Sequence, residues 1–396
     1  MRKNGINRAL IEIDGGVCAP SGFTASAIRC NFLHDGANHP DFALILGKKR
    51  YATAYLSPES VNMSSFAKLS QKHVEKSLSS AVIIQSGVAC GYGEKEDVLA
   101  EKVTRLFAPA LKIDRNEMLL ASIGQYGKEL ELTPFEIAAK NIVAGLGNAT
   151  ENSLAVAKTL EGNGKQVSYS FEIGDVTCKI GAVFSGSIDG ALICVLTTDV
   201  SISSEMLQKA LKAVANEQFY MLGGRVPTPN DCICAMASGE ANNWKITENN
   251  SDYQKFFYAL NSVSERICRI ILQASGEIFT CKVLGVKSKN SAREIAKAVV
   301  SATSIQKSLS NGHLDTQKVL SVVLGGMEKI ALHKVSIAFS SSNMEVVTFE
   351  DNLEMPIAPE TEKHFFFGEN LQIIIHANEG NYSSIAYGNF DAPIRA

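Results

Sequence analysis

The sequence has almost no excess of positive or negative charge. Its 396 residues carry 38 lysines and arginines against 41 aspartates and glutamates, a formal net charge of −3 at pH 7. So balanced a chain has no electrostatic footprint for nucleic acid or for an anionic membrane surface. Long apolar runs are also missing, and none reaches the ~18–20 residues that a membrane-spanning helix requires. We therefore expect no nucleic-acid partner and no membrane segment.

Metal-binding and disulfide patterns are equally absent. The nine cysteines are scattered, Cys232 and Cys234 form the only close pair, and no histidine follows them at zinc-finger spacing. Several stand in apolar runs, as Cys30, Cys194 and Cys268 do, which is typical of reduced core thiols. The first residues lack the apolar segment of a secretion signal. The sequence thus predicts a cytoplasmic protein with no metal and no other cofactor.

What the sequence does contain is an ordinary globular composition, with 45% hydrophobic and 20% charged residues. Short apolar strands alternate with amphipathic helices, which is compatible with an α/β fold. Strands are expected at 9–13, 25–32, 42–46, 51–56, 81–85, 118–121, 166–172, 191–196 and 278–285. Helices are expected at 64–79, 96–109, 134–146, 153–160, 204–219, 231–237, 253–273 and 290–300. The polar run at 240–250 indicates an internal linker, and so a possible sub-domain boundary.

One stretch organises the rest of the chain. Residues 180–204 read IGAVFSGSIDGALICVLTTDVSISS, with small and hydroxyl residues first and then an uninterrupted apolar run from Ala191 to Leu196. A run of this length between turn formers fits a strand buried on both faces, although periodicity alone does not distinguish it from a buried helix. A glycine-rich loop before such a strand allows another backbone to approach closely.

The same stretch resembles a known junction. A Gly/Ser loop, a run of apolar or small residues and then Thr-Asp, here ending at Asp199, are similar to the self-cleavage junction of the ornithine acetyltransferase (glutamate N-acetyltransferase) family. In that self-cleaving family, a Thr or Ser opens the strand, cuts the chain before itself and becomes the N-terminal nucleophile. Counting back from Asp199 without gaps places Ala191 at this position. A methyl group cannot attack a carbonyl, so the resemblance implies an uncut relative without its nucleophile.

Weaker matches follow in the right order from about Gly15 to the C-terminus. The phrase Ala19-Pro-Ser-Gly-Phe-Thr-Ala25 resembles the family's opening signature. Ser122-Ile-Gly-Gln-Tyr-Gly127 stands where the family has Ser-Thr-Gly-Val-Ile-Gly, whose Thr hydroxyl and Gly amide form the oxyanion hole. Gly124 is kept, whereas Ile123 replaces the hydroxyl donor, a loss that typically costs about 10²–10³ in rate. A plain turn after a strand would explain Gly124 equally well.

The resemblance also assigns substrate-site positions. Glu277 matches a family glutamate of the active-site region, and Lys307 matches the lysine of a family Ser-Pro-Leu-Val-Lys-Thr segment. Asp391 takes the place of a family asparagine near the C-terminus. Asn230 and Asp231 match a family loop, but capping of the helix expected at 231–237 accounts for both without any site.

Two hypotheses of different classes remain open. The residues kept mostly shape the backbone, whereas the nucleophile, the oxyanion hydroxyl and the family's pocket Asp, Trp and Arg are lost, and Ala396 replaces a terminal hydroxyl residue. In the first hypothesis, the protein is an uncleaved relative, a pseudoenzyme that binds a small N-acylated amino acid or a partner. In the second, it is an active acyltransferase of the arginine-biosynthesis type, or a related enzyme that processes acyl or amide groups, whose nucleophile was replaced by Ala191 or is another residue. A fold by itself does not decide between them.

The resemblance implies an architecture as well. It implies an α/β fold, an αββα sandwich of two sheets between helical layers, uncleaved, with Ala191 opening a central strand. It also implies two parts, 1–190 and 191–396, equivalent to the family's α and β subunits. Family members are dimers or larger, so we expect a homodimer or a higher homo-oligomer of intact chains.

Overall fold

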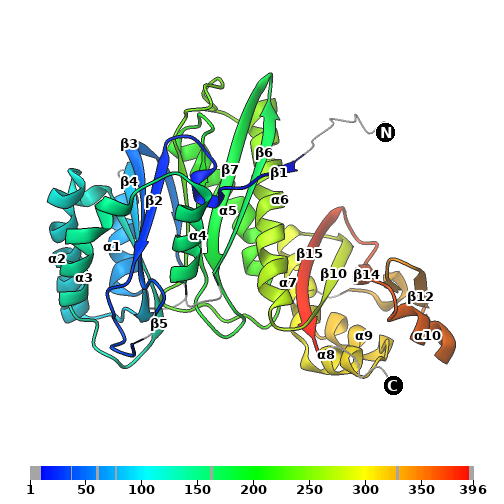
Figure 1. Cartoon of the computed structure of the whole chain (residues 1–396). Coiled ribbons are helices and arrows are strands. Elements are labelled where there is room, and N and C mark those ends of the chain that lie inside the picture. The colour runs from blue at the N-terminus through cyan, green and yellow to red at the C-terminus, as the bar shows by residue number, and fades with distance from the viewer. Residues whose placement is uncertain are drawn as a thin grey trace. The chain divides into compact units, whose positions relative to one another are not determined.

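The computed structural model describes residues 10–36, 38–58, 62–75, 78–160, 164–326 and 330–391, so Ala396 lies outside the described residues. The chain is a mixed α/β protein that divides into two compact units (Figure 1). Unit 1 comprises Met1–Gly186, Gly190–Val214 and Pro227–Val263, and unit 2 comprises Ser187–Asp189, Ala215–Val226 and Ser264–Ala396. The junction between residues 190 and 191 and the run at 240–250 both fall inside unit 1. The two subunit equivalents concern chain processing, and they stay a prediction.

The described part of unit 1 is built on a nine-stranded sheet in the order β1-β6-β7-β8-β9-β3-β4-β5, with β2 paired to β3. Its strands are β1 (Ile11–Glu12), β2 (Phe23–Ile28), β3 (Phe42–Leu56), β4 (Leu78–Val88), β5 (Met118–Gln125), β6 (Lys165–Ile173), β7 (Val176–Ser185), β8 (Ile193–Thr198) and β9 (Cys232–Ala237). β8 runs between antiparallel β7 and parallel β9, and all its residues are buried. The predicted strand therefore lies at the centre of the sheet, and it begins just after Ala191.

Two parts of this sheet share one core. Side chains from β3, β4 and β5, such as Ile45, Val82 and Leu119, belong to the same buried cluster as Val195 of β8 and Cys234 of β9. β3 serves both parts, because its register shifts between Leu46 and Tyr51: the first stretch pairs with β2 and β4, and the second pairs with β9. The strands predicted at 42–46 and 51–56 are thus one long strand.

Helices cover the outer faces of unit 1. They are α1 (Ser65–Val74), α2 (Glu94–Leu111), α3 (Thr133–Asn141), α4 (Thr150–Thr159), α5 (Ser204–Glu217) and α6 (Ser251–Gln273), of which α5 and α6 divide their residues between the units. A second core joins α1, α2 and α3 to the outer face of β3–β5 through stacked and edge-on rings of Phe42, Phe66, Phe107 and Phe135. Gln208 of α5 bonds both backbone groups of Tyr55 in β3. The layered α/β fold that the resemblance implied is confirmed.

Unit 2 holds a separate six-stranded sheet among its described residues, in the order β13-β12-β11-β14-β10-β15. Its strands are β10 (Glu277–Val286), β11 (Ser336–Ser340), β12 (Glu345–Glu350), β13 (Leu353–Glu354), β14 (Leu371–His376) and β15 (Tyr382–Phe390). Its helices are α7 (Lys289–Ser301), α8 (Thr303–Ser310), α9 (Thr316–Leu324) and α10 (Pro359–Phe365). α7 packs against β10 and β15, where Gly388 leaves room for Phe279 and Val300.

Three local predictions are wrong. The helix predicted at 231–237 is strand β9; its six residues are all buried, so no alternation marks them as a strand. The glycine-rich loop predicted before residue 191 is strand β7 as far as Ser185. Within it, Gly181 lets the backbone of Gly16 approach so closely that a Cβ would lie 1.8 Å from its carbonyl oxygen. The turn predicted after residue 121 is also strand, because β5 continues to Gln125.

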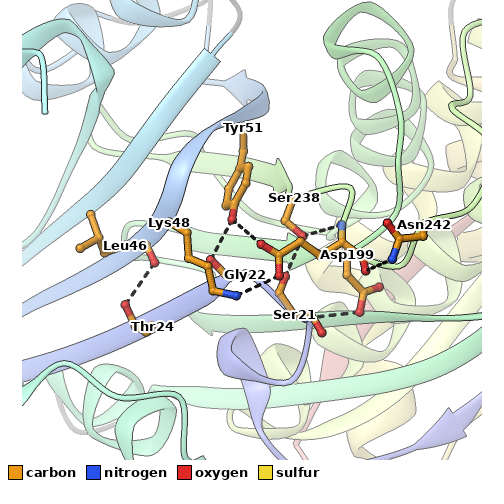
Figure 2. Close-up of polar contacts among 10 residues, drawn as sticks. Ser21, Gly22, Thr24, Leu46, Lys48, Tyr51, Asp199, Ser238 and Asn242 are labelled. Carbon is orange, nitrogen blue, oxygen red and sulfur yellow. Dashed lines mark hydrogen bonds and ion pairs between the residues drawn. The ribbon is translucent and has the colours of Figure 1, made fainter.

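The exit of β8 is fixed by a buried carboxylate. Asp199, 3% exposed, accepts hydrogen bonds from the backbone N–H of Lys179 at 2.7 Å and of Ser21 at 3.3 Å. Ser238 Oγ in turn donates to the carbonyl of Ser21 at 2.7 Å, as Figure 2 shows. Burial raises the pKa of Asp199, and the two N–H groups oppose that rise. Two phrases that carry the resemblance, around Ser21 and at Asp199, therefore meet in space.

The nine cysteines are free and buried, in agreement with their interpretation as core thiols. Burial raises the pKa of Cys18 to about 11 and that of Cys178 to about 12. Among the described residues, no helix combines the length and the apolar content needed to cross a bilayer.

Candidate functional site

The entrance of β8 is held by the loop that precedes β9. The backbone N–H of Leu192 donates to Asp231 Oδ1 at 2.9 Å, and the carbonyl of Leu192 accepts from Cys232 N at 2.8 Å. Ala191, just before, is half-buried and packs against the core cluster that contains Ile123 and Ile193. Ala191, to which the resemblance assigns the nucleophile position, thus lies at the strand entrance and presents a methyl group there.

Asp231 is the residue that fixes this entrance. It is 6% exposed, and its Oδ1 also accepts the hydroxyl of Thr228 at 2.8 Å. The capping role considered for Asn230 and Asp231 is wrong, because a strand and not a helix follows them. The match of Asp231 to the family loop has a structural reason: its carboxylate satisfies the N–H that leads into the central strand.

Asn230 points from the same loop towards the end of β5. Its Nδ2 donates to the carbonyl of Cys90 at 2.9 Å and to the hydroxyl oxygen of Tyr126 at 3.0 Å. The side chain is 3% exposed, and its Oδ1 accepts no hydrogen bond from the described residues. Because a backbone carbonyl can only accept, its contact with Nδ2 fixes the orientation of the carboxamide.

Tyr126 is the site residue that the sequence interpretation missed. It follows β5 directly and stands where the family motif has Ile, which was the available signal. Its pKa is raised chiefly by burial and further by the charge of Asp231, whereas Asn230 and Thr228 lower it through hydrogen bonds. The phenol is therefore protonated, and a hydrogen-bond donor, at neutral pH.

Gly124 is required by the contact of two strands. It lies opposite Gly87 in the parallel pairing of β4 with β5, with φ of +145°, and Gly87 has φ of +100°. A Cβ on Gly124 would lie 2.3 Å from the carbonyl carbon and oxygen of Gly87. Both glycines border a cavity of about 450 Å³ that Arg29 and Ser86 also line. Ile123, 5% exposed, points into the core between the two parts of the sheet and offers no hydroxyl.

Three other hydroxyl or thiol groups near the entrance bear on the second hypothesis. Ser185 lies opposite Ile193 in the pairing of β7 with β8 and is 7% exposed. Thr228 donates to Asp231, as described. Burial raises the pKa of the Cys90 thiol to about 12, which disfavours its thiolate. Hydroxyl oxygens are thus present at the strand entrance although residue 191 has none.

The remaining predicted site residues lie in unit 2. Glu277 begins β10 and pairs with Phe390, so that Asp391 comes next to it at the same end of the sheet; both are exposed. Lys307 is exposed in the last turn of α8, a helix that packs against β15. The structure thus places Glu277 beside Asp391 in unit 2, whereas Ala191, Ile123 and Asn230 all lie in unit 1. Among the described residues, no group of three or more His, Cys, Asp or Glu side chains is arranged to hold a metal.

Comparison with known proteins identifies the class. The profile of the ArgJ family matches residues 24–390. The chain is 23% identical over 394 residues to the arginine biosynthesis bifunctional protein ArgJ of Bacillus subtilis (strain 168), covering 96% of this chain and 94% of that protein. It is 25% identical over 369 residues to ArgJ 1 of Clostridium acetobutylicum, covering 89% of each. A solved ArgJ structure from Bacillus halodurans is 22% identical with a TM-score of 0.45, covering 49% of this chain and 92% of that one.

The chain belongs to the ArgJ family. This confirms the resemblance to the ornithine acetyltransferases and relates the chain to proteins of arginine biosynthesis.

We predict that Gly124→Ala lowers the free energy of unfolding by about 3 kcal/mol or more, because a left-handed φ and an overpacked contact each cost about 1–3 kcal/mol. Gly127→Ala is the matched control, since Gly127 also has a positive φ, of +84°, but no atom lies within 4 Å of its added Cβ. The control should lose only about 1–2 kcal/mol. Denaturant unfolding measures both, and equal losses would show that the contact with Gly87 does not matter.

Proposed function

We propose that this chain is an unprocessed member of the ArgJ family that binds a small N-acylated amino acid without transferring its acyl group. The observation that carries the proposal is the methyl group of Ala191 at the entrance of β8, where the family has its nucleophile. Without a hydroxyl there, neither cleavage before residue 191 nor an acyl intermediate on it can occur. Ile123 supports the proposal further, because the resemblance places the hydroxyl donor of the oxyanion hole at this position and the chain has an apolar side chain there.

The polar groups that remain at the entrance suit binding. Tyr126 and Thr228 offer hydroxyl groups next to an apolar core, the usual composition of a small-molecule site, and the buried Asn230 holds the Tyr126 oxygen. The roles of Glu277, Lys307 and Asp391 in holding a substrate are part of the proposal. The cytoplasmic location and the homodimer or higher homo-oligomer of intact chains stay predictions.

We predict that the purified protein is a single uncut polypeptide. Mass spectrometry of freshly prepared protein, and of protein after prolonged incubation, should give one species at the mass of the full sequence. Ala191→Thr restores the family's hydroxyl without restoring the oxyanion donor, so we expect it to cut slowly if at all, since one lost donor costs about 10²–10³ in rate. Two fragments that join at residues 190 and 191 in the unaltered chain would end the proposal.

We predict that N-acetylated amino acids raise the melting temperature in a thermal-shift screen, with the matching free amino acids as controls. A ligand at 100 times its Kd stabilises the folded state by about 2.7 kcal/mol. N-acetylornithine and N-acetylglutamate are the first compounds to try, because the resemblance points to them. No shift with any acylated amino acid at millimolar concentration would refute the binding function.

A second candidate function is supported by the contact between Thr228 and Asp231. In an acyltransferase with a different nucleophile, Thr228 Oγ would attack the acyl carbonyl, its proton would pass to Asp231, and the leaving group would take that proton away. The 2.8 Å contact is within the reach that such a pair requires. Asp231 Oδ1 already accepts two hydrogen bonds, however, one of them from the backbone N–H of Leu192, so the carboxylate also has a structural role.

We predict that no acyl adduct forms on Thr228. The protein is incubated with p-nitrophenyl acetate, digested and searched by mass spectrometry for acetylated Thr228, with Thr228→Val as the control. An acetyl group that labels Thr228 rapidly, and is absent from the variant, would favour the acyltransferase over the binding protein.

A further inference from the structure

Tyr126 is placed where a ligand at the strand entrance can reach its hydroxyl. It lies between Gly124 and Gly127, both with positive φ, where the chain turns away from the end of β5. Its side chain is 54% exposed, whereas Asn230, which holds its oxygen, is almost fully buried. The phenol is thus fixed from the protein side and open on the other.

The hydrogen bond from Asn230 determines that the phenol acts as a donor towards a ligand. Asn230 Nδ2 uses one hydrogen on the carbonyl of Cys90, so the other points at the Tyr126 oxygen, which accepts it. The phenol proton is then available for a further acceptor. Thr228 is also within hydrogen-bonding reach of the phenol, and its own hydroxyl proton goes to Asp231. A ligand oxygen that displaces or joins Thr228 as acceptor would take the phenol proton.

The charge of Asp231 decides which ligand oxygen fits. Its buried carboxylate lies close enough to Tyr126 for its charge to raise the pKa of the phenol. A ligand carboxylate at the phenol would meet repulsion, whereas a neutral carbonyl oxygen, which only accepts, would not. The group that faces Tyr126 should therefore be an uncharged acyl carbonyl.

We propose that the Tyr126 hydroxyl donates a hydrogen bond to the acyl carbonyl of an N-acylated amino acid at the entrance of β8, and that Asn230 positions it. This assignment rests on the proposed binding function. In this assignment, Tyr126, the residue directly after β5, supplies the hydrogen-bond donor for the carbonyl oxygen. Residue 123 within β5 is isoleucine and has no side-chain donor. Asn230 is a positioning residue here, since it acts on the ligand only through the phenol.

The test compares Tyr126→Phe with Tyr92→Phe by isothermal titration. Tyr92 is also exposed, at 59%, and follows the neighbouring strand β4 as Tyr126 follows β5, so its variant controls for the loss of a surface hydroxyl. The titrants are N-acetylornithine, N-acetylglutamate and the corresponding free amino acids. We expect Tyr126→Phe to weaken binding of the acetylated compound roughly 3- to 10-fold, the usual net value of one neutral hydrogen bond. Tyr92→Phe should bind it as the unaltered chain does.

The comparison of acetylated with free amino acids distinguishes the loss of a ligand contact from a structural effect of the substitution. Loss of a ligand contact lowers the affinity for the acetylated compound and not for the free amino acid. The unfolding midpoint of Tyr126→Phe falls with or without ligand, because the buried Asn230 Nδ2 loses the oxygen that accepts its hydrogen bond. Equal weakening for acetylated and free amino acids, or undiminished binding in Tyr126→Phe, overturns the assignment while the proposed function stands. If the unaltered chain binds none of the acetylated compounds, both proposals fail together.

Discussion

Two buried carboxylates hold the backbone at the two ends of the central strand, and the rest of unit 1 depends on them. Asp231 binds the N–H of Leu192 at the entrance of β8, and Asp199 binds those of Lys179 and Ser21 at its exit. A carboxylate that accepts two N–H or O–H groups offsets part of the cost of its burial, and each bond to a charged acceptor contributes about 1.5–3 kcal/mol. The strand is thereby fixed in register between β7 and β9 by groups that lie outside it.

This arrangement explains which family residues remain. Gly124 is required where β4 and β5 touch, Asp231 closes the entrance, and Asp199 connects the junction to the opening phrase around Ser21. Each of these has a packing or hydrogen-bonding role that persists whether or not a reaction takes place. Ala191 and Ile123, where the resemblance implied that hydroxyl groups are missing, contribute apolar surface to the core between the two parts of the sheet. Membership of the ArgJ family is therefore visible in the scaffold, and it says less about the chemistry.

Much of the scaffold could be predicted from the sequence, and the physical reasons for the exceptions are specific. The apolar run after Ala191 and the amphipathic helix at 253–273 were predictable, because burial on both faces or on one stripe leaves a direct pattern. β9 was not, because a fully buried strand shows no alternation, and the polar residues before it look like a helix cap. The pairing of Asn230 with Tyr126 joins residues 104 positions apart, and no local pattern records such a contact. The site was therefore predicted as single residues, and its hydrogen-bond network came only from the fold.

The same network shows why the fold needs no hydroxyl on the side chain at residue 191. The entrance of β8 is held through the backbone of Leu192 and Cys232, and the side chain at 191 makes only an apolar contact with the core. Exchange of a hydroxyl for hydrogen there leaves no buried donor or acceptor unsatisfied, so stability places little constraint on this position. Tyr126 is different, because its oxygen accepts one of the two hydrogens of a carboxamide that is otherwise buried. The side chains at 191 and 126 thus contribute differently to the fold, because the first only packs against the core and the second accepts a hydrogen bond from a buried donor.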